Sequence, residues 1–302
     1  MKINTLGIDL GNANVKTSNG VIFESKVKPG ITTMNDNDIK VTYNGADYTV
    51  GAYDGALNIR KNKHIKTAYK LCLLTAIAKS FKASNITCNI VVGVPVETFN
   101  DKNFTESIKE TISKYNEVEE IVINGEEKKI KIEKVEVFCE SGIVFSNRDK
   151  FKDEKTLVID FGGSTIDVSF WDGLRLSKSR TYKEGMITLY ENVIKKVNDT
   201  FGTEISSIMA SDMIGKKEYE IGQEIRNIGF IDAVVENYVD GLTSYINQYF
   251  PVESANSIQL IGGGAIQLAN QLKEEYDKAI LVDSAEFANA NNYKKVGEIL
   301  WI

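Results

Sequence analysis

Two aspartates follow apolar segments in the same local pattern. The first lies in Gly7-Ile8-Asp9-Leu10-Gly11 and the second in Val158-Ile159-Asp160-Phe161-Gly162-Gly163. A buried strand that ends in Asp-x-Gly places a carboxylate at a turn, where the glycine lets backbone N–H groups approach a ligand closely. Two such turns facing each other would hold a polyphosphate, and their carboxylates suit a hydrated Mg²⁺ ion. An isolated Asp-x-Gly is usually only a hairpin turn, so the prediction depends on the pair.

The repeated pattern continues beyond both aspartates. A short strand and the turn Asn19-Gly20 follow the first, and a short strand and the turn Asp172-Gly173 follow the second. The two halves of the chain are therefore expected to begin with the same unit: a buried strand, an aspartate, a tight turn and a hairpin.

A third glycine-rich segment lies near the C-terminus. Gly262-Gly263-Gly264 follows the apolar residues 257–261 and precedes a helical pattern that begins at Ala265. Backbone N–H groups at the start of a helix bind phosphate, and the helix dipole adds to the attraction. We expect these N–H groups to face a phosphate or a ribose.

The three segments together resemble a known family. The actin, sugar kinase and heat-shock chaperone ATPase superfamily carries two phosphate loops and an adenosine loop. The matching residues are, in order, Asp9-Leu10-Gly11-Asn12-Ala13-Asn14-Val15-Lys16, Asp160-Phe161-Gly162-Gly163-Ser164-Thr165-Ile166-Asp167 and Leu260-Ile261-Gly262-Gly263-Gly264-Ala265. Two shorter segments, Phe138-Cys139-Glu140-Ser141-Gly142 and Phe287-Ala288-Asn289-Ala290-Asn291, lie where the family has its connecting helices. The first loop is most similar to that of the plasmid-segregation (ParM-like) actins and their archaeal and phage relatives.

The resemblance implies a fold and a domain organisation. The fold would be α/β, the two-domain actin-like arrangement of duplicated ribonuclease H-like domains, with a nucleotide in the interdomain cleft. Residues 1–155 with 285–302 would form domain I, and residues 156–284 would form domain II. A chain of 302 residues fits two domains, because a domain averages roughly 150 residues.

The resemblance also implies roles for individual residues. Lys16 would direct its ammonium group at the β- and γ-phosphates, and Asn12 would donate to phosphate oxygens. Asp9 and Asp160 would organise the metal through water. Nucleotide contacts are expected at Asp9, Gly11, Asn12, Ala13, Asn14, Lys16, Gly162, Gly163, Ser164, Thr165, Glu184, Gly185, Gly262, Gly263 and Gly264.

Glu140 and Asp160 are the expected catalytic residues. The family places a Glu or Gln at the start of a helix, where it orients the water that attacks the γ-phosphate, and phosphoryl transfer depends mainly on such positioning. Glu140 could instead be a first-turn glutamate favoured by the helix dipole. Lys16 could likewise be an ordinary exposed strand residue.

Composition excludes several other kinds of protein. The net charge of −6 argues against a protein that coats nucleic acid by itself. Cys72, Cys88 and Cys139 are far apart and predict neither a disulfide framework nor a zinc site. The single histidine, His64, lies in the basic run Arg60-Lys61-Asn62-Lys63-His64 and is expected to be exposed to solvent. The N-terminus lacks the apolar stretch of a signal peptide, so we expect a cytoplasmic protein.

Local patterns predict the main elements. Asn-Gly is typical of type I′ hairpin turns, in which both central residues have positive φ, and it occurs at Asn19-Gly20, Asn44-Gly45 and Asn124-Gly125. The expected helices are residues 65–81, 101–115, 140–147, 187–201, 231–250 and 265–276. The expected buried strands are residues 90–94, 156–160, 166–171, 257–261 and 279–282.

The function implied by the resemblance is that of a filament-forming actin-like ATPase. It would use ATP or GTP with Mg²⁺, assemble head to tail with further copies of itself, and segregate plasmid DNA through a DNA-bound adaptor of the ParR type. The alternative is a small-molecule, sugar-type kinase of the same superfamily, with Asp101 as the nearest candidate base. Asp160-Phe161-Gly162 also spells the protein-kinase metal motif, but the other kinase motifs and the P-loop motif do not occur.

Overall fold

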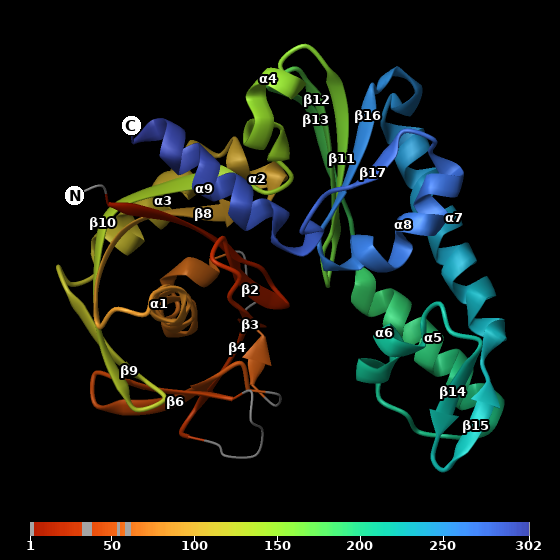
Figure 1. Ribbon diagram of the computed structural model, residues 1–302, viewed down its shortest axis with the longest axis horizontal. Coiled ribbons are helices and arrows are strands. Elements are labelled where there is room, and N and C mark those ends of the chain that lie inside the picture. The colour runs from red at the N-terminus through yellow and green to blue at the C-terminus, as the bar shows by residue number, and fades with distance from the viewer. Residues whose placement is uncertain (1–2, 32–37, 53–54, 58–61, 302) are drawn as a thin grey trace. The chain divides into compact units, whose positions relative to one another are not determined.

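The computed structural model describes residues 3–31, 38–52, 55–57 and 62–301. The chain forms two compact units, residues 1–147 with 287–302 and residues 148–286 (Figure 1). The domain boundaries expected from the sequence stay a prediction.

The first unit is built on a mixed sheet. Its strands among the described residues are β1 (Asn4–Leu10), β2 (Asn14–Thr17), β3 (Ile22–Glu24), β4 (Lys26–Pro29), β5 (Ile39–Tyr43), β6 (Ala46–Val50), β7 (Ala56–Leu57), β8 (Asn85–Val94), β9 (Glu119–Ile123) and β10 (Glu126–Cys139). The strand order is β3-β2-β1-β8-β10-β9-β5-β6-β4-β7. β8 pairs in parallel with β1 and with β10, whereas the outer strands pair antiparallel.

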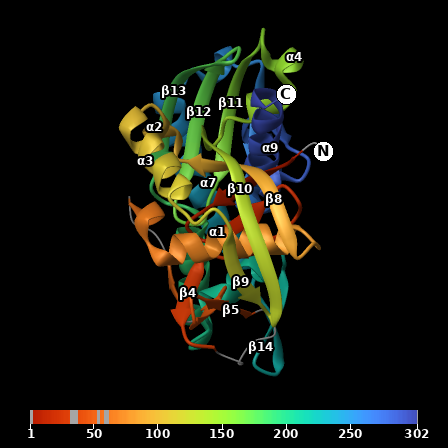
Figure 2. The same cartoon turned by 90° about the vertical axis from the view of Figure 1, so that its left-hand side faces the viewer.

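One helix fills the inside of this sheet. The sheet curls around α1 (Thr67–Ser80), which contacts β1, β2, β4, β6, β9 and β10 and is seen lengthwise in Figure 2. The sequence Lys70-Leu71-Cys72-Leu73-Leu74-Thr75-Ala76-Ile77-Ala78 is apolar almost all round the helix, and every residue from Leu71 to Ala78 is buried. A helix that is apolar on all sides belongs inside a core. The expected helix is therefore confirmed, except that Ile65 precedes it and is 61% exposed.

The other face of β1 and β8 is covered by α9 (Ala288–Leu300). Along β1, Leu6, Ile8 and Leu10 belong to the core that contains α1, so Gly7 points to the opposite face. A Cβ at Gly7 would lie 1.9 Å from the Ala290 carbonyl oxygen, so only glycine lets α9 lie this close to the strand. The remaining helices are α2 (Val96–Phe99) and α3 (Lys102–Ser113).

The three Asn-Gly turns are of two kinds. Asn44 and Asn124 have φ of 50° and 51°, the following glycines also have positive φ, and each pair joins two strands directly, as expected for type I′. The type I′ prediction is wrong at Asn19-Gly20, where only Gly20 has positive φ. The loop there is longer, because the Ser18 N–H donates to the Gly7 carbonyl and the Ser18 hydroxyl accepts from the Gly7 N–H.

The second unit is a smaller sheet with helices on one face. Its strands are β11 (Lys155–Phe161), β12 (Ile166–Asp172), β13 (Arg175–Tyr182), β16 (Ser257–Ile261) and β17 (Ala279–Leu281), with β14 (Glu218–Ile221) and β15 (Glu224–Asn227) forming a separate hairpin. The helices are α4 (Arg148–Phe151), α5 (Met186–Phe201), α6 (Ala210–Met213), α7 (Asp232–Tyr249) and α8 (Gly263–Glu275). The strands and helices expected in this half are confirmed to within two residues at each end.

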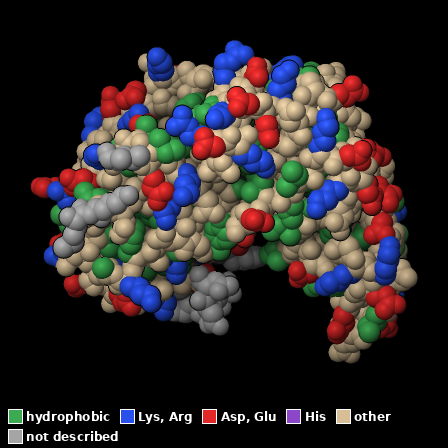
Figure 3. All heavy atoms as spheres, turned by 45° about the horizontal axis from the view of Figure 1, so that its top comes forward, with side chains coloured by type: hydrophobic (Ala, Val, Ile, Leu, Met, Phe, Trp, Pro, Cys, Tyr) green, Lys and Arg blue, Asp and Glu red, His purple; other side chains and the backbone are tan. Residues whose placement is uncertain are grey.

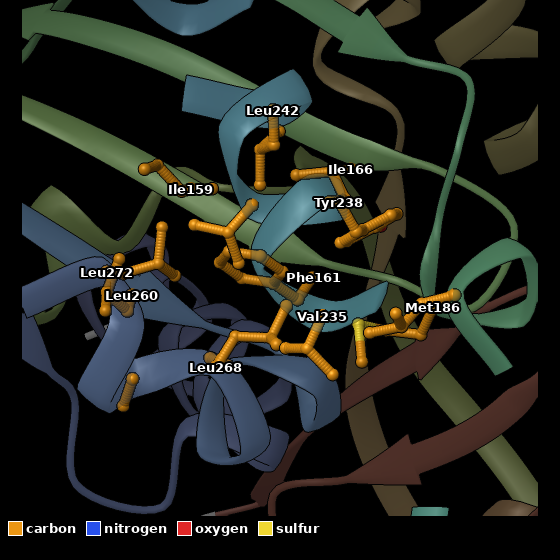
Figure 4. Close-up of a cluster of buried hydrophobic side chains, with 14 of the residues drawn as sticks. Ile159, Phe161, Ile166, Met186, Val235, Tyr238, Leu242, Leu260, Leu268 and Leu272 are labelled. Atoms are coloured by element: carbon orange, nitrogen blue, oxygen red, sulfur yellow. The ribbon is translucent and has the colours of Figure 1, made fainter. Parts of the chain in front are cut away.

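The core of the second unit forms between β11, β12 and β16 and the helices α5, α7 and α8. Figure 4 shows Phe161 among side chains from the sheet and from three helices, with Val235 from α7, Leu268 from α8 and Met186 from α5 close by. The alternation of β11 directs Leu157, Ile159 and Phe161 into this core. Asp160 therefore lies on the opposite face of the strand.

The two sheets repeat the same strand order. β3-β2-β1-β8-β10 in the first unit corresponds to β13-β12-β11-β16-β17 in the second. In both, an antiparallel hairpin is followed in the sheet by a parallel neighbour. Asp9 pairs with Lys16, and Asp160 pairs with Asp167, at equal distances from their turns. The repeat predicted from the sequence is therefore present in the structure.

Two further sequence predictions are wrong. Residues 140–147 do not form an α-helix that begins at Glu140: Glu140 follows β10 in a turn, and only Ile143–Asn147 is helical, as a 3₁₀ segment. His64 is 4% exposed rather than solvated, because its ring packs edge-on against Phe104 and its Nε2 lies 3.1 Å from the Ser107 hydroxyl. Arg60 and Lys61 of the basic run lie outside the described residues.

The structure also shows the state of the cysteines and the distribution of surface charge. Cys72, Cys88 and Cys139 are buried free thiols. On the face drawn in Figure 3, Lys and Arg side chains lie among Asp and Glu side chains. Among the described residues, no helix is long and apolar enough to cross a membrane.

Candidate functional site

The turn between β1 and β2 is tight and presents backbone N–H groups. A Cβ at Gly11 would lie 2.7 Å from the Asn14 carbonyl oxygen, so the turn is too tight for any other residue. Ser25 closes the loop, because its hydroxyl donates to the Gly11 carbonyl at 2.6 Å and its N–H donates to the Ala13 carbonyl at 2.8 Å. The N–H groups of Asn12 and Ala13 donate to no acceptor within the described part of the chain. They remain available to a ligand.

Cations surround the carboxylate beside this turn. Burial raises the pKa of Asp9, and Lys16, Lys63 and a hydrogen bond from Asn289 oppose the rise. Burial lowers the pKa of Lys63, and the charges of Glu140 and Asp9 oppose that shift. Lys63 donates to the Leu10 carbonyl and, at 3.2 Å, to the Asn12 amide oxygen. Two ammonium groups beside N–H donors that have no acceptor in the described part of the chain suit a phosphate.

Lys63 is a site residue that sequence reasoning missed. It lies in a basic run, and such runs usually mark a solvated surface. The side chain instead reaches back to the loop between β1 and β2, more than fifty residues earlier in the chain. Nothing in its sequence neighbours indicates that contact.

Glu140 belongs to the same group of residues. Its N–H donates to the Val94 carbonyl at 2.8 Å, which fixes it to the end of β8. The next residue, Ser141, has φ of 61°, and its N–H donates to the Asn289 amide oxygen at 3.0 Å. The structure thus brings Glu140 together with Asp9, Lys63 and Asn289 in the first unit.

The turn between β11 and β12 repeats the geometry of the first. A Cβ at Gly162 would lie 2.7 Å from the Thr165 carbonyl oxygen, as at Gly11. The N–H groups of Gly163, Ser164 and Thr165 donate to no acceptor among the residues described. This loop therefore offers a run of backbone donors, as expected for residues that would surround phosphates.

The start of α5 supports this second loop. The N–H groups of Gly185, Met186 and Ile187 donate to the carbonyls of Ser164, Gly162 and Gly163 at 3.2, 3.1 and 2.9 Å. A Cβ at Gly185 would lie 2.5 Å from the Gly163 carbonyl oxygen. Gly185 thus holds the loop rather than presenting its own N–H to a ligand. Glu184 is exposed, and its carbonyl accepts from the Tyr238 hydroxyl at 2.6 Å.

The second loop carries carboxylates where the first carries a cation. Asp160 and Asp167 face each other directly on β11 and β12 and are 8% and 6% exposed. The Thr181 hydroxyl donates to Asp167 at 2.6 Å, which orients that carboxylate. Sequence reasoning quoted Asp167 within the loop motif but assigned it no role. The pair makes this loop the better place for a hydrated divalent cation.

The third glycine segment lies against Asp160. Gly262 has φ of 87°, and a Cβ there would lie 2.7 Å from the Asp160 Oδ1. Its N–H donates to the Ala285 carbonyl at 2.8 Å, so the expectation that all three glycine N–H groups face a ligand is wrong for Gly262. Gly263 and Gly264 form the first turn of α8, and Gly264 lets that helix pack on Met186.

Every site residue expected from the sequence thus falls into one of two groups. Asp9, Gly11, Asn12, Ala13, Asn14, Lys16 and Glu140 lie in the first unit, and Asp160, Gly162, Gly163, Ser164, Thr165, Glu184, Gly185, Gly262, Gly263 and Gly264 lie in the second. Asp101, the candidate base of the alternative kinase function, caps α3 by accepting from the Phe104 N–H at 3.1 Å.

Solved structures share this fold over the whole chain. Ta0583, an archaeal actin homologue in complex with ADP, matches with a TM-score of 0.79 and 17% identity over 98% of this chain and 100% of that one. Apo ParM of psk41 matches with a TM-score of 0.76 and 17% identity over 99% and 98% of the two chains. A 15-stranded ParM filament from Clostridium botulinum matches with a TM-score of 0.77 and 19% identity over 99% and 100%. The fold is the two-sheet α/β fold of actin-like proteins.

Two family models divide the chain between them. The model of the N-terminal domain of actin-like proteins matches residues 7–142, and the model of the C-terminal part of the plasmid segregation protein ParM matches residues 149–295. The comparison with curated protein sequences found no match. The chain belongs to the ParM-like plasmid-segregation family of actin-like proteins.

Proposed function

We propose that this protein binds ATP or GTP with Mg²⁺, hydrolyses it, and assembles into filaments while the nucleotide is bound. The observation that carries the proposal is the repeated loop with unequal charge. Both loops present unused N–H groups, but the first has Lys16 across from Asp9, whereas the second has Asp167 across from Asp160.

The unequal charges support different roles for the two loops. Lys16, Lys63 and the N–H groups of the first loop would bind phosphate oxygens. Asp160 and Asp167 would hold Mg²⁺ through its water ligands, and the bound ion would neutralise negative charge on the phosphates. Asp9, whose charge interacts with Lys16 and Lys63, would orient metal-bound water. Glu140 would orient the attacking water by accepting a hydrogen bond from it.

The relatives support both nucleotide binding and filament formation. An archaeal homologue of the same fold binds ADP, and a ParM of the same fold forms a filament. A head-to-tail contact is heterologous and does not close, so it produces an open polymer. Nucleotide can drive assembly only if it binds the assembly-competent state more tightly.

The match to the plasmid-segregation family supports a proposal about the partners. We propose that the filament moves plasmid DNA through a DNA-bound adaptor of the ParR type and does not itself bind DNA. The net charge of −6 supports the need for an adaptor. Asp101, the candidate base of the kinase alternative, caps α3 through one carboxylate oxygen, which gives this residue a structural role.

Light scattering tests the proposal. Adding ATP and Mg²⁺ should raise scattering only above a threshold protein concentration, and the signal should fall as nucleotide is consumed. GTP in place of ATP identifies the preferred base. Scattering that stays flat across micromolar concentrations, with a non-hydrolysable analogue present, would refute filament formation.

A further inference from the structure

Asn289 joins two parts of the first unit that carry charged site residues. It lies in the first turn of α9, is 7% exposed, and packs where α9 crosses β1. Its amide oxygen accepts from the Ser141 N–H at 3.0 Å, and its side chain also hydrogen-bonds to Asp9. A carboxylate at Asp9 can only accept, so the Asn289 NH₂ group is the donor. Only a side chain with one donor and one acceptor can make both bonds.

The backbone held by Asn289 adopts an unfavourable conformation. Ser141 is fully buried and has φ of 61°, which costs a non-glycine residue about 1–2 kcal/mol. Such a residue keeps its conformation only where the surroundings determine it. The Ser141 N–H is fixed by Asn289, and the N–H of the preceding Glu140 is fixed by the Val94 carbonyl. The turn that presents Glu140 is therefore held on both sides.

We propose that Asn289 is a positioning residue that ties the Glu140 turn to Asp9. The proposal rests on the proposed nucleotide hydrolysis, in which Glu140 orients the attacking water. Asn289 contacts the backbone beside Glu140 and the Asp9 carboxylate, and it sets their separation without being required to contact the nucleotide. Lys63, whose charge interacts with both carboxylates, supports the same arrangement.

The chain supplies a matched control in the same helix. Asn292 is one turn further along α9 and fully buried, and neither its amide nitrogen nor its amide oxygen has a partner among the described residues. Asn289→Ala and Asn292→Ala remove the same atoms from buried positions. Loss of Asn289 should slow nucleotide turnover about tenfold while nucleotide affinity stays within about twofold of wild type. Asn292→Ala should leave both unchanged.

A double-mutant cycle separates positioning from a general structural effect. If Asn289 acts through Glu140, Asn289→Ala should cause no further loss of turnover in a Glu140→Ala background. Additive losses in the double variant would overturn the proposal. Asn289→Asp gives a second route if the alanine variant does not fold. It keeps the acceptor for Ser141 but loses the donor to Asp9, so turnover should fall while the Ser141 amide stays protected.

Amide hydrogen exchange tests the bond independently of hydrolysis. The Ser141 amide should exchange at least about tenfold faster in Asn289→Ala than in wild type, and at the wild-type rate in Asn292→Ala. An unchanged Ser141 rate in Asn289→Ala would overturn the proposal. A wild-type protein that hydrolyses no nucleotide would refute the proposed function instead, and the Ser141 exchange rate would then decide whether Asn289 holds the turn.

Discussion

Gly162→Ala is the substitution that most sharply probes the second loop. The new Cβ would lie 2.7 Å from the Thr165 carbonyl oxygen, a distance that real Cβ atoms do not show. In a close-packed turn the oxygen must retreat by about half an ångström, which also displaces the N–H groups of residues 163–165. A hydrogen bond to a charged group contributes about 1.5–3 kcal/mol, so misalignment of one such donor should weaken nucleotide binding about 10- to 100-fold.

Isothermal titration with ADP and Mg²⁺ measures this effect. Gly11→Ala, which meets the Asn14 carbonyl at the same 2.7 Å, should weaken binding to a similar extent. Gly241→Ala is the control, because its nearest neighbour is the Tyr182 hydroxyl oxygen at an ordinary 3.6 Å. That variant should bind normally and gain about 0.5–1 kcal/mol of stability, since alanine favours the α7 helix. Wild-type affinity in a folded Gly162→Ala protein would show that the loop does not contact the nucleotide.

Three further predictions concern the carboxylates. Asp160→Ala should abolish Mg²⁺-dependent hydrolysis in a phosphate-release assay, and wild-type turnover would disprove the two-loop arrangement. Glu140→Ala should retain nucleotide affinity while slowing phosphate release by orders of magnitude and lengthening filament lifetime; an unchanged release rate would leave Glu140 without a catalytic role. Burial raises the pKa of Glu119, but hydrogen bonds from Lys70, Tyr43 and the Asn116 N–H outweigh it and hold the pKa below its usual range. A depressed folded-state pKa stabilises the fold above the unfolded pKa of about 4.5, and this contribution disappears as the pH falls through the folded-state value. Glu119→Gln should therefore lower the free energy of unfolding by about 2 kcal/mol at neutral pH, with the difference from wild type shrinking in acid; thermal melts at a series of pH values would contradict this if the difference were constant.

Features set by neighbouring residues could be predicted from the sequence. The turns at Asn44-Gly45 and Asn124-Gly125, the apolar strands and the periodic helices all depend on a few consecutive residues, and the structure contains them. The repeated Asp-x-Gly pattern also predicted that both halves begin with the same strand, turn and hairpin, and both sheets contain this local unit. The geometry at Gly11 and Gly162 follows from the same pattern.

Features set by distant residues could not be predicted in this way. Glu140 was expected to begin a helix, but the conformation of Ser141 depends on Asn289, which is 148 residues away. His64 and Lys63 looked like solvated members of a basic run. His64 is covered by Phe104 and Ser107 of α3, and Lys63 is drawn to the carbonyl of Leu10. Their burial depends on packing between elements that the sequence pattern does not pair.

Electron microscopy of the purified protein, with and without a non-hydrolysable ATP analogue and Mg²⁺, tests nucleotide-dependent assembly most directly. Filaments should appear with the nucleotide above a threshold protein concentration, and they should be absent without it and in the Asp160→Ala variant. A protein that stays monomeric under all these conditions, and that transfers the γ-phosphate of ATP to the hydroxyl group of a small molecule, would contradict the proposal and establish the kinase alternative.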